Sequence, residues 1–164
     1  MKNNKSKIKT LQELIKITSN YSGRIGIVTG CFDVLHVGHL SLINFAKSKV
    51  DLLIIGIDPD KVVRQVKGVT RPIFQDKIRA EVISNLTAVD YVFIIEALNL
   101  SKNFNETFRK LYKELKITHI ITNMDADNFY LEKSGHADFL GIKFVLQKEK
   151  RKSSSSKIIE RLGL

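Results

Sequence analysis

Two histidines three positions apart, His36 and His39, are the residues in this sequence best suited to chemistry. Residues three apart share one face once a helix begins, and the free N–H groups at a helix N-terminus favour anions. Two imidazoles at such a place could donate hydrogen bonds to phosphoryl oxygens whose charge grows in a transition state. The pair could instead cap or pack the helix. No Cys or Glu beside them completes a zinc pattern, so no metal site is predicted there.

Glycines flank this histidine segment. Gly30 would let the backbone approach a ligand closely, and Gly38 would let another segment pack against the start of the helix. In a parallel α/β sheet the ligand crevice lies at the carboxyl ends of the strands, so a strand-to-helix turn here is where a phosphate is expected.

A run of four serines near the C-terminus is a second candidate phosphate element. Hydroxyls and free N–H groups at a helix start would suit phosphate oxygens, and Arg151 and Lys152 add positive charge. The residues concerned are Ser154, Ser155 and Ser156. Ordinary helix capping followed by a frayed loop is the alternative for such a run.

Apolar runs of strand length alternate along the chain with segments of helical periodicity, which is typical of a parallel α/β sheet. The runs are almost wholly apolar, as strands covered on both faces should be. Strands are expected at 24–29, 52–57, 91–95, 119–122 and 143–146, and helices at 37–49, 75–85, 105–114 and 129–138. A further helix is expected to start within 153–156 and run to 162, and another, at 9–17, should pack on the outside. The expected fold is a Rossmann-like parallel sheet of five strands with helices on both faces.

Length and composition are those of one domain, with a helical N-terminal extension at 1–21 and an α/β core at 22–164. The chain has 164 residues, 43% of them hydrophobic, and a single cysteine, Cys31. No apolar stretch approaches the roughly 20 residues that span a bilayer, and the N-terminus lacks the pattern of a signal peptide. We therefore expect a cytoplasmic protein with no membrane partner. A net charge of +10 favours anionic ligands, although a lysine-rich solvated surface would give the same excess.

The motif Gly30-Cys31-Phe32-Asp33, followed by His36-Val37-Gly38-His39, resembles the G-x-F-D-x-x-H-x-G-H signature of the cytidylyltransferase-like nucleotidyltransferases. The resemblance covers most of the chain and is greatest to the adenylyltransferase domain of ADP-heptose synthesis. It continues through 9–14, Lys67-Gly68-Val69-Thr70-Arg71-Pro72, Arg79 and 88–90.

This resemblance implies transfer of a nucleoside monophosphate from a nucleoside triphosphate, most simply ATP, to a phosphorylated acceptor such as heptose 1-phosphate. Pyrophosphate would be released, and Mg²⁺ would accompany the triphosphate. His36 and His39 would stabilise the reacting phosphate, the serine run would bind the β- and γ-phosphates, Arg79 would face phosphates, and Lys67 would close over the reaction centre. The resemblance also assigns nucleotide contacts to Gly30, Cys31, Phe32 and Gly38, and acceptor contacts to Asp33 and Asp60.

One loop departs from the family pattern. Relatives carry K-G-G-D-Y or G-D-D-W after the fourth strand, whereas this chain has Thr122-Asn123-Met124-Asp125-Ala126-Asp127. Asp125 stays in register with the family aspartate, and Asn123 can adopt the turn conformation that glycine supplies in relatives. Both residues are expected to contact the nucleotide, but the identity of the base is left open.

Two alternatives therefore stay open. CTP could replace ATP, with glycerol 3-phosphate or another alcohol phosphate as acceptor, or the chain could be a non-catalytic nucleotide- or nucleic-acid-binding module. The sequence lacks RNA-binding aromatic and helix-turn-helix patterns, which argues against nucleic acid. Relatives are commonly dimers, so a homodimer is a further prediction. Of the remaining histidines, His119 is expected to be structural, and His136 would reach the acceptor only if its loop folded back over the site.

Overall fold

The computed structural model describes residues 4–96, 104–150, 153–161 and 163, without the side chains of 4, 5, 156 and 157. The strands are β1 (Ile25–Gly30), β2 (Leu52–Ile57), β3 (Tyr91–Ile94), β4 (His119–Asn123) and β5 (Lys143–Gln147). The helices are η1 (Asn4–Lys7), α1 (Leu11–Ser19), α2 (Val37–Lys47), α3 (Asp60–Lys67), α4 (Asp76–Ser84), α5 (Phe104–Glu114), α6 (Tyr130–Leu140) and α7 (Ser155–Arg161).

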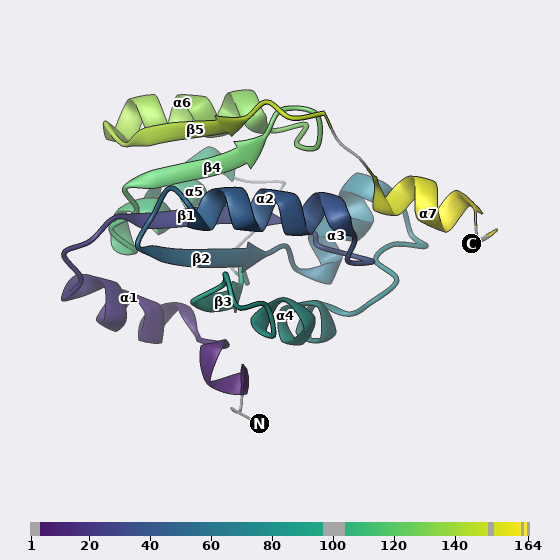
Figure 1. Ribbon diagram of the computed structural model, residues 1–164, viewed down its shortest axis with the longest axis horizontal. Helices are drawn as coiled ribbons and strands as arrows, with labels where there is room; N and C mark the ends of the chain where they lie inside the picture. Colours follow the sequence, from purple (N-terminus) through teal and green to yellow (C-terminus); the bar gives the residue numbers. More distant parts are fainter. Residues whose placement is uncertain (1–3, 97–103, 151–152, 162, 164) are drawn as a thin grey trace.

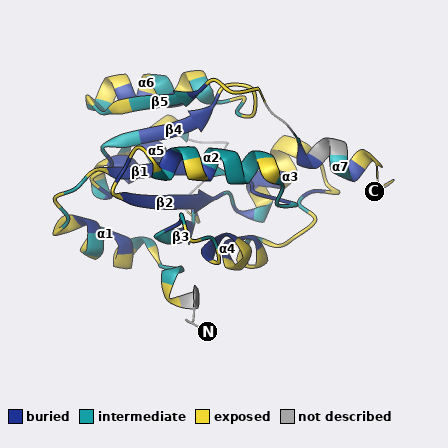
Figure 2. Cartoon of the chain, viewed as in Figure 1, coloured by how far each residue is buried: buried dark blue, intermediate teal, exposed yellow. Residues whose placement is uncertain are grey.

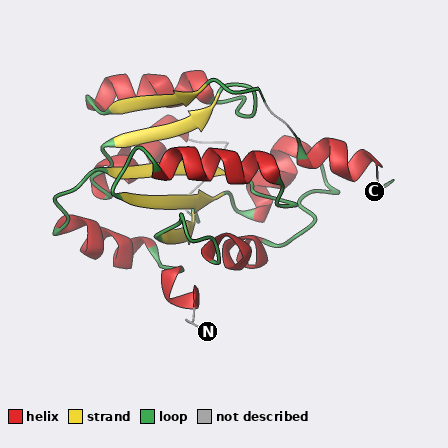
Figure 3. Ribbon diagram, in the orientation of Figure 1, coloured by secondary structure: helices red, strands yellow, loops and turns green. Residues whose placement is uncertain are grey.

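The strands form one parallel sheet in the order β3-β2-β1-β4-β5 (Figures 1 and 3). The chain builds outward from β1 to β3 and then crosses back to β4 on the other side of β1. The strand order therefore reverses between β1 and β4, and in open parallel sheets the ligand crevice lies at such a reversal. The predicted fold is confirmed: the chain is an α/β protein with a five-stranded, Rossmann-like parallel sheet.

Both faces of the sheet are buried, and β2 shows how its sequence achieves this. All six of its residues are buried, and they alternate between two apolar clusters. Leu52 and Ile54 pack with residues of α1, α5 and α6, whereas Leu53, Ile55 and Ile57 pack with residues of α2 and α4. Side chains alternate between faces along a strand, so an unbroken apolar run is what a doubly covered strand requires. Figure 2 shows β2 as wholly buried, whereas the edge strand β5 is largely of intermediate exposure.

The predicted N-terminal helix is present as α1 and packs against the core. Thr10 and Glu13 form a reciprocal capping box at the start of α1, which is a strong helix-start signal. Leu14 of this helix is fully buried in the cluster that contains β1 and β2 residues. The helix therefore packs on the outside of the fold, as predicted, and Leu14 on its inner face supplies part of the core.

Each element predicted from periodicity is present, with ends within two residues of the expected ones. Helix α3 was not predicted, because the region after β2 contains charged residues and only a short apolar pattern. Its Val62 and Val63 are nevertheless buried against the fold, while its other face is exposed. Within the described ranges no helix is both long and apolar enough to cross a membrane.

Candidate active site

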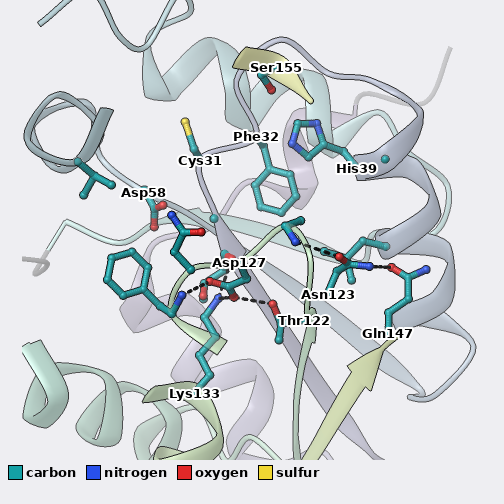
Figure 4. Close-up of a pocket in the computed structure, with 18 of the residues that line it drawn as sticks. Cys31, Phe32, His39, Asp58, Thr122, Asn123, Asp127, Lys133, Gln147 and Ser155 are labelled. Atoms are coloured by element: carbon teal, nitrogen blue, oxygen red, sulfur yellow. Dashed lines mark hydrogen bonds and ion pairs between the residues drawn. The ribbon is translucent and has the colours of Figure 1, made fainter. Parts of the chain in front are cut away.

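A pocket opens at the carboxyl ends of β1 and β4, where the strand order reverses. It is lined by the loop after β1, the first turns of α2 and α7, the end of α3, and the facing parts of α5 and α6. Figure 4 shows His39 and Ser155 on one side of the pocket and Asp127 and Lys133 on the opposite side. The site predicted at the strand-to-helix turn therefore coincides with a pocket built by elements from the whole chain.

The two predicted histidines lie together at the start of α2. His36 is the N-cap residue, and its Nδ1 accepts a hydrogen bond from the backbone N–H of Gly38 at 3.1 Å. The rings of His36 and His39 are stacked with centroids 3.9 Å apart, and the Phe32 ring lies 5.3 Å from that of His39. His36 therefore both caps helix α2 and lines the pocket, so the two interpretations of this residue are compatible.

Gly38 is required by the packing around this helix start. A Cβ at this position would lie 2.9 Å from Cε1 of His36, 3.0 Å from its Nδ1 and 3.2 Å from the backbone oxygen of Ser153. The absence of a side chain therefore lets the histidine loop and the segment before α7 approach each other. The predicted role of Gly38 as a close-packing glycine is confirmed.

Asp33 holds the loop after β1 and does not line the pocket. Its buried carboxylate accepts hydrogen bonds from the Arg71 guanidinium and from the backbone N–H groups of Ile73 and Phe74. Burial raises the pKa of Asp33, but these donors outweigh burial and bring it below its usual value. The expectation that Asp33 contacts the acceptor is therefore replaced by a structural role, because both carboxylate oxygens are already bonded.

The same loop contains two backbone outliers. Phe32 has φ 52° and Val34 has φ 51°, a left-handed region that non-glycine residues, and β-branched ones above all, rarely occupy. Such conformations persist where the surroundings hold them, and they cluster at functional sites. The bonds to Asp33, between these two residues, provide that restraint and place Phe32 against His39.

The serine run, the second predicted phosphate element, contacts this loop. Ser155 is the first residue of α7, lines the pocket, and donates a hydrogen bond from Oγ to the backbone oxygen of Asp33. Ser154 is buried but does not line the pocket. The side chain of Ser156 lies outside the described part of the chain.

Arg79 lies beneath the pocket rather than in it. Its guanidinium is 1% exposed and donates to the backbone oxygens of Cys31, Asp58 and Phe74. It also forms an ion pair with Asp60 at 2.6 Å. The expectations that Arg79 faces phosphates and that Asp60 contacts the acceptor are therefore corrected. The two residues neutralise each other while joining the loops after β1 and β2.

Lys67 lines the pocket from the last turn of α3, and its side chain is exposed. Gly30 and Cys31 line it from the end of β1, and Asp58 from the end of β2. Burial raises the pKa of the Cys31 thiol and of the Asp58 carboxyl, with partial opposition from the positive charge of Lys67. Lys67 is therefore an accessible cation in the pocket, whereas burial favours the neutral forms of Cys31 and Asp58.

The loop after β4 folds differently from the prediction based on the family pattern. Asn123 lines the pocket, but its amide donates to Gln147 and to the backbone oxygen of Glu149, and its side-chain oxygen accepts from the backbone N–H groups of Asp125 and Ala126. Asn123 therefore shapes the loop as an Asx turn. Asp125 is exposed and does not line the pocket, so its expected nucleotide contact is corrected.

Asp127 takes the inward position instead, and it was not predicted. It accepts hydrogen bonds from the Thr122 hydroxyl, the Lys133 ammonium and the backbone N–H of Phe129. Burial raises the pKa of Asp127, but Lys133 and the other donors outweigh burial, and the pKa lies below its usual value. The only sequence signal for an inward-facing Asp127 is that it is a second acidic residue, two positions after Asp125.

His136, also on α6, lines the pocket and is 2% exposed. Its ring packs against those of Phe108 and Tyr112, with both centroid distances 6.0 Å. The sequence analysis expected His136 to reach the site only if a loop folded back over it. The structure instead places His136 at the pocket from within helix α6. Burial lowers the pKa of His136, so the neutral imidazole is favoured.

The pocket thus combines a helix-start anion site with a strand-order reversal, and it lies within the segment matched by a known family. A family model described as cytidylyltransferase-like matches residues 27–161. The chain belongs to the cytidylyltransferase-like family. The resemblance predicted from the histidine motif is confirmed.

Named relatives of this cytidylyltransferase-like chain come from several bacteria. It is 34% identical over 160 residues to the "Bifunctional protein HldE" of Helicobacter pylori, a match that spans 95% of this chain and 31% of the relative. It is 41% identical over 97 residues to the protein of the same name from Aliarcobacter butzleri, across 57% of this chain and 20% of that one. The chain therefore spans about a third of the length of the H. pylori relative.

Solved structures with the same fold include a lipopolysaccharide core biosynthesis protein from Thermoplasma volcanium. The two share 25% identity with a TM-score of 0.63, over 79% of this chain and 99% of that one. A pantoate-beta-alanine ligase from Francisella tularensis has a TM-score of 0.64 at 19% identity, over 88% of this chain and 67% of that one. The second likeness bears on the fold alone.

Proposed function

We propose that this protein transfers the adenylyl group of ATP to a sugar 1-phosphate of the heptose 1-phosphate type and releases pyrophosphate. The observation that carries the proposal is the meeting of the stacked histidines, Gly38 and Ser155 around one pocket at the strand-order reversal. The resemblance to the adenylyltransferase domain of ADP-heptose synthesis and the relatives named HldE support ATP and a heptose phosphate.

The reaction is a displacement at the α-phosphorus of ATP. An oxygen of the acceptor phosphate forms the new bond to that phosphorus, while the bond to the β-phosphate oxygen breaks and its electron pair leaves with pyrophosphate. Such a reaction asks the protein mainly for positioning and charge stabilisation. No covalent step on the enzyme is needed.

His36 is prepared to donate a hydrogen bond through one particular nitrogen. Because Nδ1 accepts from the Gly38 N–H, the neutral ring carries its proton on Nε2. With His39 stacked on it, the pair would donate to α-phosphate oxygens as their charge increases. The first turn of α7 would receive the terminal phosphates, and Lys67 would add a mobile positive charge from the opposite rim.

Magnesium would enter as the Mg²⁺–triphosphate complex. No group of three or more metal-ligating side chains occurs among the residues that the structure describes. Magnesium usually needs only one or two carboxylates together with substrate phosphates. Asp58 would provide one from the end of β2, because both carboxylate oxygens of Asp127 are already bonded. When bound, the ion would neutralise charge on the leaving pyrophosphate.

The first experiment is calorimetric titration of the protein with Mg-ATP and, separately, with Mg-CTP. Tighter binding of ATP would support the proposal, whereas preference for CTP would move the search to glycerol 3-phosphate and other alcohol phosphates. Binding of neither by a folded sample would favour a non-catalytic protein or obligatory prior binding of the acceptor, and adding heptose 1-phosphate separates these two.

Turnover is then measured as pyrophosphate release with heptose 1-phosphate. The variant Lys67→Ala should lose about tenfold or more in turnover while its thermal stability is unchanged, because the Lys67 side chain is exposed. Lys61→Ala, an exposed lysine on the same helix that does not line the pocket, is the matched control. Equal activity of the two variants would remove Lys67 from the mechanism, and no pyrophosphate from the wild type would overturn the proposal.

A further inference from the structure

The pocket has two chemically different halves on opposite sides of the carboxyl end of β1. One half is built from the starts of α2 and α7 and contains the histidine pair. The other half lies against α5 and α6 and contains Phe104, Phe108, Phe129, Glu132 and His136. Phosphates bound in the first half would leave the second half open to a sugar, either that of the nucleoside or that of the acceptor.

This α5–α6 half presents both apolar and hydrogen-bonding surface. The Phe104 ring lies 4.9 Å from that of Phe108 and 5.9 Å from that of Phe129, which gives a continuous aromatic wall. The Glu132 side chain is exposed at this wall, and within the described residues no hydrogen bond or ion pair engages its carboxylate. His136 is buried behind it, and its Nδ1 has no hydrogen-bond partner in the described part of the structure.

Such an arrangement fits a ring that bears several hydroxyl groups. The C–H groups of a sugar ring contact aromatic faces, while its hydroxyls can donate to a carboxylate and can satisfy an unpaired imidazole nitrogen. A buried polar atom without a partner costs free energy, so a ligand that supplies the missing bond gains affinity.

A cationic ligand fits less well, although aromatic walls with a nearby acid can also bind quaternary ammonium groups. The Lys133 ammonium lies in the pocket beside Asp127, and Lys67 adds a second positive charge. A quaternary ammonium would be repelled by both lysines, and it has no N–H or oxygen with which to bond His136.

We propose that Glu132, His136 and Phe129 form the acceptor-specificity subsite and bind the hydroxylated ring of the sugar 1-phosphate. This inference rests on the function proposed above and adds which residues select the acceptor. The phosphate of the sugar points toward Lys67 and the histidines, and its ring lies against α5 and α6.

The test is the kinetics of Glu132→Gln with heptose 1-phosphate and ATP as substrates. We expect KM for heptose 1-phosphate to rise about tenfold or more, as for the loss of a hydrogen bond to a charged group, with KM for ATP changed less than about twofold. Asp138→Asn is the matched control, because it removes one negative charge from an exposed position on the same helix, outside the pocket. An unchanged KM for heptose 1-phosphate, or equal increases for both substrates, would overturn the inference.

A pair of substitutions at His136 separates binding from packing. His136→Asn keeps a hydrogen-bonding group near the position of Nδ1, whereas His136→Leu keeps only apolar volume. The Asn variant should retain more affinity for heptose 1-phosphate even if both variants are equally destabilised in thermal unfolding. If affinity follows stability alone, His136 is structural and leaves the proposed subsite.

Competition with other acceptors completes the test. Mannose 1-phosphate, a smaller sugar phosphate, should inhibit transfer to heptose 1-phosphate better than glycerol 3-phosphate or phosphocholine, and Glu132→Gln should reduce that difference. Stronger inhibition by phosphocholine would overturn the assignment of the subsite to a sugar. If the wild type transfers adenylate to heptose 1-phosphate but these discriminations are absent, only the subsite fails. If it transfers none, the proposed function fails first.

Discussion

The hydroxyl of Ser155 donates a hydrogen bond to the backbone oxygen of Asp33, although the two residues are 122 positions apart in the sequence. This bond joins the first turn of α7 to the loop after β1. It brings the serine run and the histidine motif, the two phosphate elements at opposite ends of the chain, to the same pocket.

Ser155→Ala should therefore weaken Mg-ATP binding and reduce the free energy of unfolding by about 1 kcal/mol, the usual contribution of one hydrogen bond. Ser48→Ala is a suitable control, because its hydroxyl also donates to a backbone oxygen, that of Phe45, but at an exposed position at the far end of α2. Titration calorimetry and urea unfolding of both variants make the comparison. Equal effects on ATP affinity would show that α7 is not specifically involved.

Substitutions at His36 can separate its capping role from its proposed catalytic role. His36→Asn keeps a good N-cap residue, whereas His36→Ala loses the cap at a cost of about 1 kcal/mol. Both should lower turnover by about 10² to 10³, the cost of one lost oxyanion donor, but only the Ala variant should be clearly less stable. Pyrophosphate release and thermal unfolding measure the two effects. Wild-type turnover in His36→Asn would mean that capping alone explains this residue.

Alanine substitution at two helical glycines, Gly38 and Gly135, should change the free energy of unfolding in opposite directions. Gly38→Ala places a methyl group against the His36 ring and the Ser153 backbone, so the protein should lose stability and ATP affinity. Gly135→Ala, in the interior of α6, meets nothing within 4 Å and should raise the free energy of unfolding by about 0.5–1 kcal/mol. Chemical denaturation of the two variants tests this difference, and a neutral Gly38→Ala would contradict the close approach.

Arg79→Lys should act mainly on stability. A lysine cannot reproduce the fork of donors that reaches three backbone oxygens and Asp60, so a loss of about 3 kcal/mol is expected for a disrupted buried ion pair. Arg64→Lys, exposed on α3, should be near neutral. The denaturant midpoints of the two variants and the wild type measure this difference in stability. A fully stable Arg79→Lys variant with reduced turnover would restore the idea that Arg79 acts on phosphates.

Acid stability should depend on Asp33. The folded-state pKa of Asp33 lies below its usual value of 3.8, because backbone N–H groups and Arg71 outweigh the effect of burial. A lowered pKa means that the stabilisation is complete above the unfolded-state value and is lost as the pH falls through the folded-state value. The free energy of unfolding, measured from pH 6 downward, should therefore begin to decrease once the pH is lower than about 4. Asp33→Asn should show a smaller fall from a lower starting stability, and parallel curves would contradict this account.

The sequence alone determined the parallel α/β fold and the position of the histidine site. An unbroken apolar run such as β2 has one stable solution, a strand buried on both faces, and local periodicity is enough to find it. The histidine motif is also a local signal, because its residue types and spacing lie within ten positions after one strand. The conformation of that loop, by contrast, depends on bonds from distant residues. Helix α3 lacked such a signal, because two buried valines in a charged segment do not give a recognisable helical periodicity of apolar residues.

The tertiary structure decided which charged residues face the ligand. Asp33 and Arg79 look like site residues in the sequence, but partners 38 and 19 positions away, Arg71 and Asp60, neutralise them beneath the pocket. Asp127 and Glu132 carry no such mark, and His136 was expected to reach the site only from a folded-back loop, yet the loop after β4 and helix α6 bring all three to the pocket lining. A buried charge is tolerated only where the fold supplies its partner, and those partners come from distant segments. Local sequence therefore reveals where the site lies, whereas the packing of distant segments determines which side chains are left to act in it.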